Sequence, residues 1–207
     1  MRLRITYSKT DAMRYTGNLD LHRAWERTFR RANLPLAYSQ GFHPQPRINL
    51  ASALPLGFTS DGEVADIWLE KDPPLQEIRA ALEQALPPGI LIHSIEEVDN
   101  QAPSLQTQVQ SAEYIVILLE NPSGLEQRIA DLLRLKNIPR QRRDKAYDLR
   151  PLILDVQRMP DDARGYSRLK MRLLSQDGAT GRPEEVLAAM DIQPETARVH
   201  RTRLFFA

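Results

Sequence analysis

The stretch LPLAYSQGFHPQPRINLASALPLG, from Leu34 to Gly57, decides how the first half of the chain folds. Its four prolines and its two glycines exclude a continuous helix or a central strand, because proline lacks a backbone donor and restricts the preceding residue. The side chains in it that can stack, hydrogen-bond or carry charge are Tyr38, Gln40, Phe42, His43 and Arg47. We expect a stiff loop that forms a recognition surface. The alternative is a connection that packs Tyr38 and Phe42 into the core.

Outward from this loop, hydrophobic periodicity predicts a strand, a helix, two strands, a second helix and a final strand. The strands are expected at 3–7, 47–53, 64–69 and 90–98, and the helices from residue 18 to about 32 and at 75–86. This βαββαβ order is that of a ferredoxin-like domain, an antiparallel sheet with two helices on one face. The sequence therefore predicts an α+β fold.

The first predicted helix has defined ends and two distinct faces. Asn18 is the expected N-cap, and Asn33 can adopt a left-handed conformation before Pro35 prevents further helix. Its apolar stripe comprises Leu21, Ala24, Trp25, Thr28, Phe29 and Ala32. Its opposite face is charged and comprises Arg23, Glu26, Arg27, Arg30 and Arg31. We expect the stripe to pack on the sheet and the arginines to face outward.

The second half repeats this pattern. A helix expected at 123–136 has an apolar stripe 104 residues after that of the first helix, and both helices end in Asn-(Leu or Ile)-Pro. Strands are expected at 114–119, 149–156, 166–174 and 197–205, and Glu185–Met190 lies 108 residues after Glu77–Leu82. Chance similarity between amphipathic helices is the alternative. We predict tandem duplicated ferredoxin-like domains at 1–99 and 111–207, joined by a polar linker at 100–110.

The residue types restrict the chemistry. The absence of cysteine excludes disulfides, thiolate nucleophiles, zinc-thiolate sites and iron-sulfur clusters, and the four histidines lack metal-binding spacing. Glycine-rich phosphate loops, paired carboxylates and nucleophile motifs are also missing from the sequence. We therefore expect no cofactor, no metal and no enzymatic activity. An alternative assigns His43, near Tyr38 and Arg47, as a general acid or base in RNA cleavage.

Charge is segregated along the chain although the formal net charge is only +1. Residues 1–60 hold nine Lys or Arg against three Asp or Glu, residues 61–100 hold two against ten, and residues 134–150 hold seven against two. Basic segments can attract phosphates or an acidic protein surface, so they mark the candidate binding regions. The alternative is that they are solvated faces that pair with each other.

We expect partner or RNA binding by residues whose side chains can pair with phosphates or carboxylates, or stack on bases. They are Arg23, Arg27, Arg30, Arg31, Tyr38, Phe42, His43, Arg47, Arg140, Arg142, Arg143, Lys145, Arg150, His200 and Arg201. Local pairing of these arginines with Asp20, Glu26, Asp144 and Asp148 is the alternative. The strand expected at 64–69 has acidic residues and lacks the aromatic pattern of an RNA-recognition motif, which disfavours base stacking on that sheet.

The sequence contains no apolar run of membrane-spanning length, and the opening MRLRITYSKT lacks the apolar core of a signal peptide. We expect a cytoplasmic protein with no membrane association.

Several motifs resemble those of the radical-SAM-linked family DUF2344. They are the runs Tyr15–Leu21, Glu26-Arg27, Arg30–Ala32, Leu34–Pro44, Ala53–Gly57, Asp148–Pro151, Arg182–Leu187 and His200–Thr202. The resemblance covers nearly the whole chain. It implies relatives that are fused to, or encoded beside, cobalamin-binding radical SAM proteins and that are often encoded near ribonuclease E/G. Without cysteines this chain cannot hold the radical SAM cluster itself.

Three functions are compatible with these patterns. The first is a noncatalytic regulator of RNA metabolism that binds a ribonuclease E/G-type endoribonuclease and restrains its activity. The second is an RNA-binding accessory subunit of a cobalamin-dependent radical SAM enzyme that modifies tRNA or rRNA. The third is an RNA endonuclease, which depends on His43 and on analogy between folds.

Overall fold

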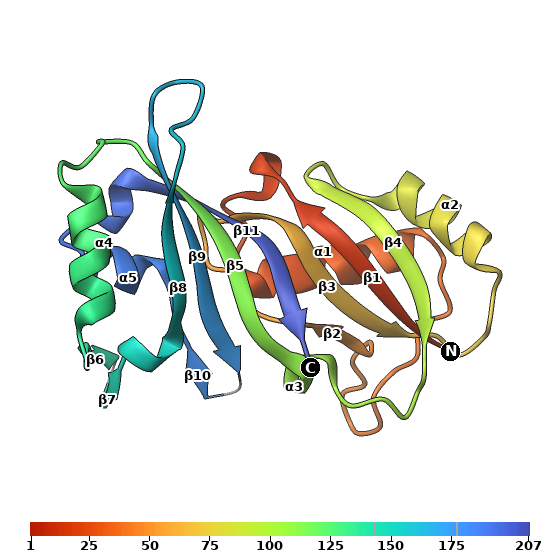
Figure 1. Cartoon of the computed structure of the whole chain (residues 1–207). Helices are drawn as coiled ribbons and strands as arrows, with labels where there is room; N and C mark the ends of the chain where they lie inside the picture. Colours follow the sequence, from red (N-terminus) through yellow and green to blue (C-terminus); the bar gives the residue numbers. More distant parts are fainter. Residues whose placement is uncertain (143, 177) are drawn as a thin grey trace. The chain divides into compact units, whose positions relative to one another are not determined.

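The computed structural model describes residues 1–142, 144–176 and 178–207 and divides into two compact units, Met1–Val109 and Gln110–Ala207 (Figure 1). Helices and antiparallel strands are mixed in both units. The α+β class predicted from the sequence is confirmed.

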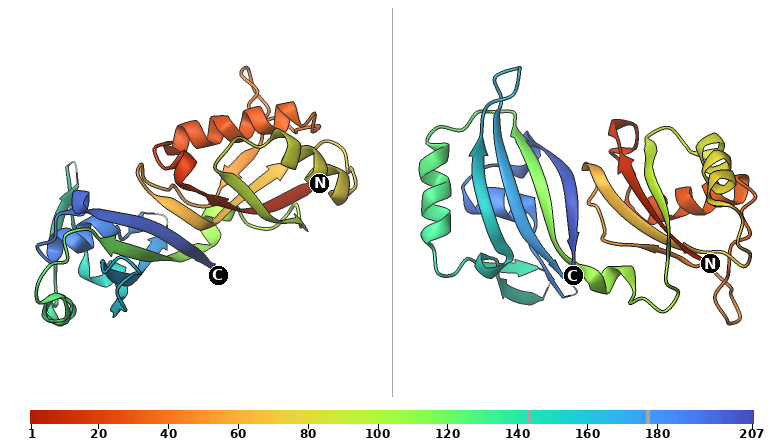
Figure 2. Two further views of the ribbon diagram at one scale, coloured as in Figure 1. Left: turned by 90° about the horizontal axis from the view of Figure 1, so that it is seen from above. Right: turned by 45° about the vertical axis from the view of Figure 1, so that its right-hand side comes forward.

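The first unit has one sheet with helices over one of its faces. Its elements are β1 (Arg2–Lys9), α1 (Asn18–Arg31), β2 (Ile48–Leu50), β3 (Thr59–Trp68), α2 (Leu75–Ala85), β4 (Ile90–Val98) and α3 (Leu105–Gln108), with a 3₁₀ turn at Asp11–Met13. The strand order is β4-β1-β3-β2, and each pair of neighbours is antiparallel. Figures 1 and 2 show α1 and α2 on the same face.

Strand register separates an apolar face from a charged face. Leu3 pairs with Ile67 and Ile5 with Ala65, and all four side chains are buried in the core. The alternate residues of β1 point to the other face, because side chains alternate along a strand. Two of these are arginines, Arg2 and Arg4, which lie opposite Trp68 and Asp66.

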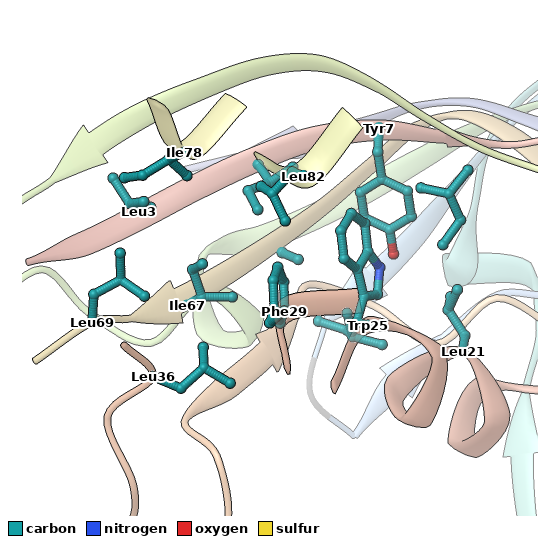
Figure 3. Close-up of a cluster of buried hydrophobic side chains, with 14 residues drawn as sticks. Leu3, Tyr7, Leu21, Trp25, Phe29, Leu36, Ile67, Leu69, Ile78 and Leu82 are labelled. Atoms are coloured by element: carbon teal, nitrogen blue, oxygen red, sulfur yellow. The ribbon is translucent and has the colours of Figure 1, made fainter. Parts of the chain in front are cut away.

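The core of the first unit is built around the aromatic residues of α1. The Trp25 and Phe29 rings stack with their centroids 5.2 Å apart, and Tyr7 of β1 meets Trp25 edge-on at 4.9 Å (Figure 3). Leu21 and Thr28 are buried on the same side of the helix. The central part of the predicted stripe, Leu21, Trp25, Thr28 and Phe29, is therefore confirmed.

The start of α1 differs from the prediction, whereas its end agrees with it. Gly17, rather than Asn18, occupies the N-cap position, and its lack of a side chain leaves α1 without a side-chain cap. Asn33 has a φ of +53°, the left-handed conformation expected where this helix stops.

The segment predicted to be a linker, 100–110, is structured in part. It contains α3, whose Leu105 is fully buried, and β5 begins at Val109. Arg2 donates hydrogen bonds to the carbonyl oxygens of Ala102 (2.6 Å) and Pro103 (2.9 Å). These contacts tie the segment to the first unit, which residue composition alone did not indicate.

The second unit also contains an antiparallel sheet and helices. Its elements are β5 (Val109–Leu118), α4 (Leu125–Arg134), β6 (Pro139–Arg142), β7 (Lys145–Asp148), β8 (Ile153–Met159), β9 (Ser167–Gln176), β10 (Ala179–Thr180), α5 (Pro183–Ala189) and β11 (Ala197–Phe206), with 3₁₀ turns at Arg150–Leu152 and Pro194–Thr196. The main sheet has the order β8-β9-β5-β11, and β10 pairs with the end of β9. The hairpin of β6 and β7 was not predicted.

Candidate functional site

The proline-rich loop forms a short hairpin above its own base. Tyr38 and Pro46 pair across it, and the backbone amide of Ser39 donates to the carbonyl of Gln45 over 2.8 Å. The backbone amide of Gln45 donates in return to the Ser39 hydroxyl over 3.0 Å. These hydrogen bonds, together with the prolines, restrict the hairpin backbone to one conformation.

Residues at the tip of this hairpin face the solvent. Phe42 is completely exposed (102%), and Tyr38 is 39% exposed. Gly41 has a φ of +138°, which favours glycine at the turn. Figure 2 shows the hairpin, coloured orange, projecting from the first unit. The alternative in which Phe42 packs into the core is therefore wrong, whereas the predicted exposed loop is present.

A pocket of about 530 Å³ opens at the base of the hairpin. It lies within the first unit, between the start of α1, the hairpin, β2, the end of β3 and α3. Its lining comprises Asn18, His22, Ser39, Gln45, Pro46, Arg47, Ile48, Asn49, Leu50, Ala53, Trp68 and Gln106. Arg47 is the single member of the predicted binding set in this lining.

Arg47 and Trp68 form a flat cationic surface in the pocket. The Arg47 guanidinium carbon lies 4.6 Å from the centroid of the indole ring. A guanidinium held in this way interacts with the ring electrons and keeps its outer surface available to a ligand. Arg2 also lies over this ring, at 4.9 Å.

Near Trp68 on β3, the Asp66 carboxylate is neutralised. Asp66 is fully buried and accepts hydrogen bonds from Arg2 Nη2 (2.6 Å) and Arg4 Nε (2.9 Å). Arg2 is buried as well, so this pair is shielded from water. The strand that looked acidic in the sequence therefore presents no free carboxylate at Asp66.

The pocket lining is polar but contains no acidic side chain. Its ionisable side chains are His22 and Arg47, and the remaining polar groups are four amides, one hydroxyl and the indole N–H of Trp68. The side-chain oxygens of Asn18 and Asn49 are buried and accept no hydrogen bond from any described residue. Such a lining suits a ligand that has hydrogen-bond donors and negative charge.

The predicted arginines of α1 lie outside this pocket. Arg23 pairs with Asp20 (3.4 Å) and Arg30 with Glu26 (2.7 Å), as the local-pairing alternative expected. Arg27 and Arg31 are exposed, and within the described ranges neither has an ion pair. Both cations remain available on the outer face of the helix.

The basic residues of the second unit differ in accessibility. Arg142 and Lys145 are exposed and line a separate pocket of about 700 Å³, while Arg140 is half-buried. Tyr147 also lines this pocket. Its burial, and then its hydrogen bond with Glu185, raises the pKa of its hydroxyl to about 12. Arg143 lies outside the described residues.

Two predicted binding residues have buried or structural positions. Arg150 donates hydrogen bonds to the carbonyl oxygens of Leu133 (3.2 Å), Leu135 (3.2 Å) and Ile153 (3.1 Å). The first two are carbonyl groups at the C-terminal end of α4, which the helix itself leaves without a hydrogen bond. Arg201 is fully buried, and the adjacent His200 is half-buried. The sequence overestimated the surface role of Arg150 and Arg201, because residue type does not indicate which arginines cap a helix or lie inside.

A family described as "Uncharacterized protein conserved in bacteria (DUF2344)" matches residues 2–183. The chain belongs to this family. No curated protein matches the DUF2344 chain in sequence.

Among solved structures, the DUF2344 chain is similar to one in the crystal structure of a Cbf5-Nop10-Gar1 complex, with a TM-score of 0.52 and 11% identity. The similarity covers 98% of this chain and 48% of the other, so the DUF2344 chain spans about half the length of that protein. A chain in the structure of an H/ACA RNP bound to a substrate RNA containing 2′-deoxyuridine has a TM-score of 0.44 and 8% identity, covering 89% of this chain and 43% of that one. The first similarity describes the fold alone.

The DUF2344 chain also contains a serine-histidine-aspartate cluster that the sequence did not suggest. Ser8 Oγ donates to Asp61 Oδ1 (3.1 Å) and lies 2.6 Å from His93 Nε2. In a nucleophilic triad the serine donates to the histidine, and the carboxylate bonds to the other imidazole nitrogen. Here the serine stands between the two and is buried, so the cluster does not have the triad arrangement.

The described residues contain neither a cluster of metal ligands nor a membrane-spanning helix. No group of three or more His, Asp or Glu side chains in the described ranges is arranged to hold a metal ion. None of the helices in those ranges combines the length and apolar character needed to cross a bilayer. His43 lies exposed in the hairpin, with no hydrogen bond to any described residue.

Proposed function

We propose that this DUF2344 protein is a noncatalytic RNA-binding component of RNA metabolism, and that the pocket at the base of the hairpin holds an unpaired part of the RNA. The observation that carries the proposal is the acid-free pocket in which Arg47 lies over Trp68. Single-stranded RNA is typically bound by stacking of its bases on aromatic rings or guanidinium planes, together with hydrogen bonds to base edges.

The surroundings of the pocket favour a polyanion. Arg47 is exposed at the pocket and has no ion pair in the described part of the chain. The buried Asp66 is neutralised by Arg2 and Arg4, which removes one source of repulsion near Trp68. Phosphate groups of a bound strand could therefore contact Arg47 while a base enters the pocket.

The test is a titration of labelled single-stranded RNA with the full chain at several salt concentrations, followed by fluorescence anisotropy. We expect the affinity to fall as salt rises, because phosphate contacts release counterions. Arg47→Ala should weaken binding, whereas Arg79→Ala on α2 should leave it unchanged, because Arg79 lies outside the pocket lining and pairs with Glu83. Absence of binding at low salt would exclude this function.

RNA bound in this way could be presented to a modifying enzyme. We propose a cobalamin-dependent radical SAM enzyme acting on tRNA or rRNA as one such partner, on the basis of the family resemblance. Adding the protein to that enzyme should increase modification of the RNA substrate, and Arg47→Ala should reduce the increase. An unchanged rate of modification on addition would contradict the partnership.

A second candidate is the regulator of a ribonuclease E/G-type enzyme, and the exposed Phe42 favours it. A bare aromatic ring on a stiff loop can act as an anchor in a partner's pocket, since aromatic residues dominate protein interfaces. We expect calorimetry without RNA to detect binding to the catalytic region of such a nuclease. Phe42→Ala should weaken that binding, and the wild-type chain should slow RNA cleavage. Equal binding by the variant would remove Phe42 from the interface.

We further propose that the two units are duplicated ferredoxin-like domains. The proposal is supported by the corresponding strand orders β4-β1-β3-β2 and β11-β5-β9-β8 and by buried stripes at the same positions of α1 and α4. In an experimental structure, superposition of the two units should align α1 with α4 and α2 with α5. A superposition that aligns other elements would contradict duplication.

A further inference from the structure

One face of the main sheet in the second unit lies outside the core. Residues that pair directly across two antiparallel strands point to the same face of the sheet. The buried pairs of β5 and β9 are Tyr114 with Met171 and Val116 with Leu169. The pairs that alternate with them are Glu113 with Arg172, Ile115 with Lys170 and Ile117 with Arg168. The residues of these alternating pairs therefore point to the opposite face, where they are half-buried or exposed.

Helix α4 lies on the buried side of this sheet. Arg158 of β8 is opposite Leu169, and its guanidinium pairs with Glu126 of α4 over 3.1 Å. Because Leu169 belongs to the buried face, α4 is placed on that side as well. The face that carries Arg172 is therefore free of α4, and we call it the open sheet face.

The open sheet face carries a row of cations. Arg168, Lys170 and Arg172 follow one another at every second position of β9, roughly 6.8 Å apart along the strand. The carboxylates on this face of β5 and β8 are Glu113 and Asp155, which is opposite Arg172. Glu113 pairs with Lys170 over 2.8 Å. Neither Arg168 nor Arg172 has an ion pair in the described ranges, so both can attract a polyanion.

Arg172 reaches across β5 to an aromatic ring on β11. Its guanidinium carbon lies 4.1 Å from the centroid of the Phe205 ring, and that of Arg203 lies 5.8 Å away. Arg172 Nε donates to the Ser111 hydroxyl over 3.2 Å, while its two terminal amino groups have no acceptor among the described residues. Arg172 and Arg203 are both exposed, so both can contact a ligand.

These features favour unpaired RNA over an acidic segment of a protein. Positive charge would attract either one, but a guanidinium plane on an aromatic ring adds a surface on which a nucleobase can stack. The half-buried Ile115 and Ile117 add apolar area on the same face. A duplex keeps the faces of its bases stacked inside, so the strand must be unpaired.

We infer that the open sheet face is a second binding surface for single-stranded RNA. A base stacks on the Arg172 guanidinium, and Arg168 and Arg203 contact neighbouring phosphates. This surface rests on the proposed RNA-binding function and extends it to the second unit.

The first measurement is a fluorescence anisotropy titration of the full chain with labelled oligouridylate of about ten nucleotides. We expect Arg172→Ala to weaken binding about tenfold, and Arg172→Lys to recover only part of the loss, because an ammonium group cannot stack on a base. Arg134→Ala is the matched control. It removes the same charge from α4, on the other side of the sheet, where Arg134 pairs with Asp131, and it should leave the affinity unchanged.

The second measurement locates the bound RNA. Photoreactive thiouridine in the same oligonucleotide, followed by digestion and mass spectrometry, should crosslink to the peptide that contains Phe205. Arg172→Ala should reduce this crosslink, while a crosslink to Trp68 in the pocket of the first unit should persist.

The outcomes separate this surface from the function on which it rests. Unchanged affinity of Arg172→Ala, or crosslinks confined to the first unit, would overturn the sheet surface and leave the proposed function intact. A loss of affinity in Arg172→Ala with none in Arg47→Ala would support the sheet surface and overturn the role of the pocket.

Absence of RNA binding at low salt would overturn both, and binding of an oligoglutamate peptide in its place would assign the open sheet face to an acidic protein segment. If Arg172→Ala fails to fold, as checked by its thermal unfolding, Arg203→Ala replaces it and should also weaken RNA binding. The Arg203 side chain donates no hydrogen bond to a described residue, so its removal should not disturb the sheet.

Discussion

Arg47 lies over the indole ring of Trp68, with its guanidinium carbon 4.6 Å from the ring centroid. Arg47 lies just before β2, and Trp68 is the last residue of β3, which pairs with β2 in the sheet. The two residues are 21 positions apart in the sequence. Their contact places the cationic Arg47 side chain against an aromatic ring in the lining of the pocket. The proposed RNA contact depends on this arrangement.

Substitution of Arg47 should separate its charge from its planar shape. We expect Arg47→Ala to weaken single-stranded RNA binding by about 1 to 2 kcal/mol and to reduce the slope of log affinity against log salt by about 0.7. Arg47→Lys should restore the slope but not the full affinity, because an ammonium group cannot stack. Anisotropy titrations at several salt concentrations measure both quantities. Full recovery by lysine would show that the charge alone matters.

Removal of the Asp66 carboxylate should destabilise the first unit. We expect Asp66→Ala to lower the free energy of unfolding by about 3 to 5 kcal/mol, because the buried Arg2 would lose the negative charge that compensates its own. Urea unfolding followed by tryptophan fluorescence measures this unit, since both tryptophans, Trp25 and Trp68, belong to it.

The control for this change is Asp20→Ala, which removes an exposed ion pair with Arg23. It should change the free energy of unfolding by less than about 1 kcal/mol. Similar losses in the Asp20 and Asp66 variants would contradict the structural role of the buried pair.

Arg150 should matter for stability even though sequence marked it as a binding residue. Arg150→Ala removes three hydrogen bonds to carbonyl oxygens, including those of Leu133 and Leu135 near the end of α4. We expect a loss of about 1 to 3 kcal/mol, seen as a lower melting temperature by circular dichroism. The exposed Arg142→Ala should change stability by no more than about 0.5 kcal/mol. An equal shift for both variants would argue against the capping role.

Asp148 should contribute a pH-dependent part of the stability. Hydrogen bonds from the backbone amides of Ile138 and Arg150, and then from the Asn137 side chain, lower the pKa of its carboxyl group. A lowered folded-state pKa means that the carboxylate stabilises the fold above the unfolded value of about 4 and that this contribution is lost as pH falls further.

We therefore expect Asp148→Asn to be less stable than the wild type at pH 7, with a difference that shrinks as the pH falls below about 4. Thermal unfolding at a series of pH values measures this difference. Asp144→Asn is the control, because Asp144 is exposed and no hydrogen bond to it involves the described residues. A difference independent of pH would show that the Asp148 charge is not responsible.

The hairpin and α1 show how much the sequence could predict. Local sequence was sufficient for the exposed loop, because Pro44, Pro46 and Gly41 restrict the backbone whatever the surroundings are. It was also sufficient for the buried positions of α1, since helical periodicity places Leu21 and Trp25 on one face. The Asn18 cap was wrong because the helix starts one residue away from the position expected from residue type.

The sequence by itself determined the α+β class, the stiff loop and the apolar faces, because these depend on neighbouring residues and backbone restrictions. Only the tertiary structure decided which charges are available. Asp66 meets Arg2 across 64 positions because the antiparallel pairing of β1 with β3 places Asp66 opposite Arg4 and diagonal to Arg2, and the pairing of β2 with β3 places Asn49 opposite Asp66. Burial and strand pairing, rather than residue type, therefore made Arg150 and Arg201 structural and left Arg47 exposed at a pocket.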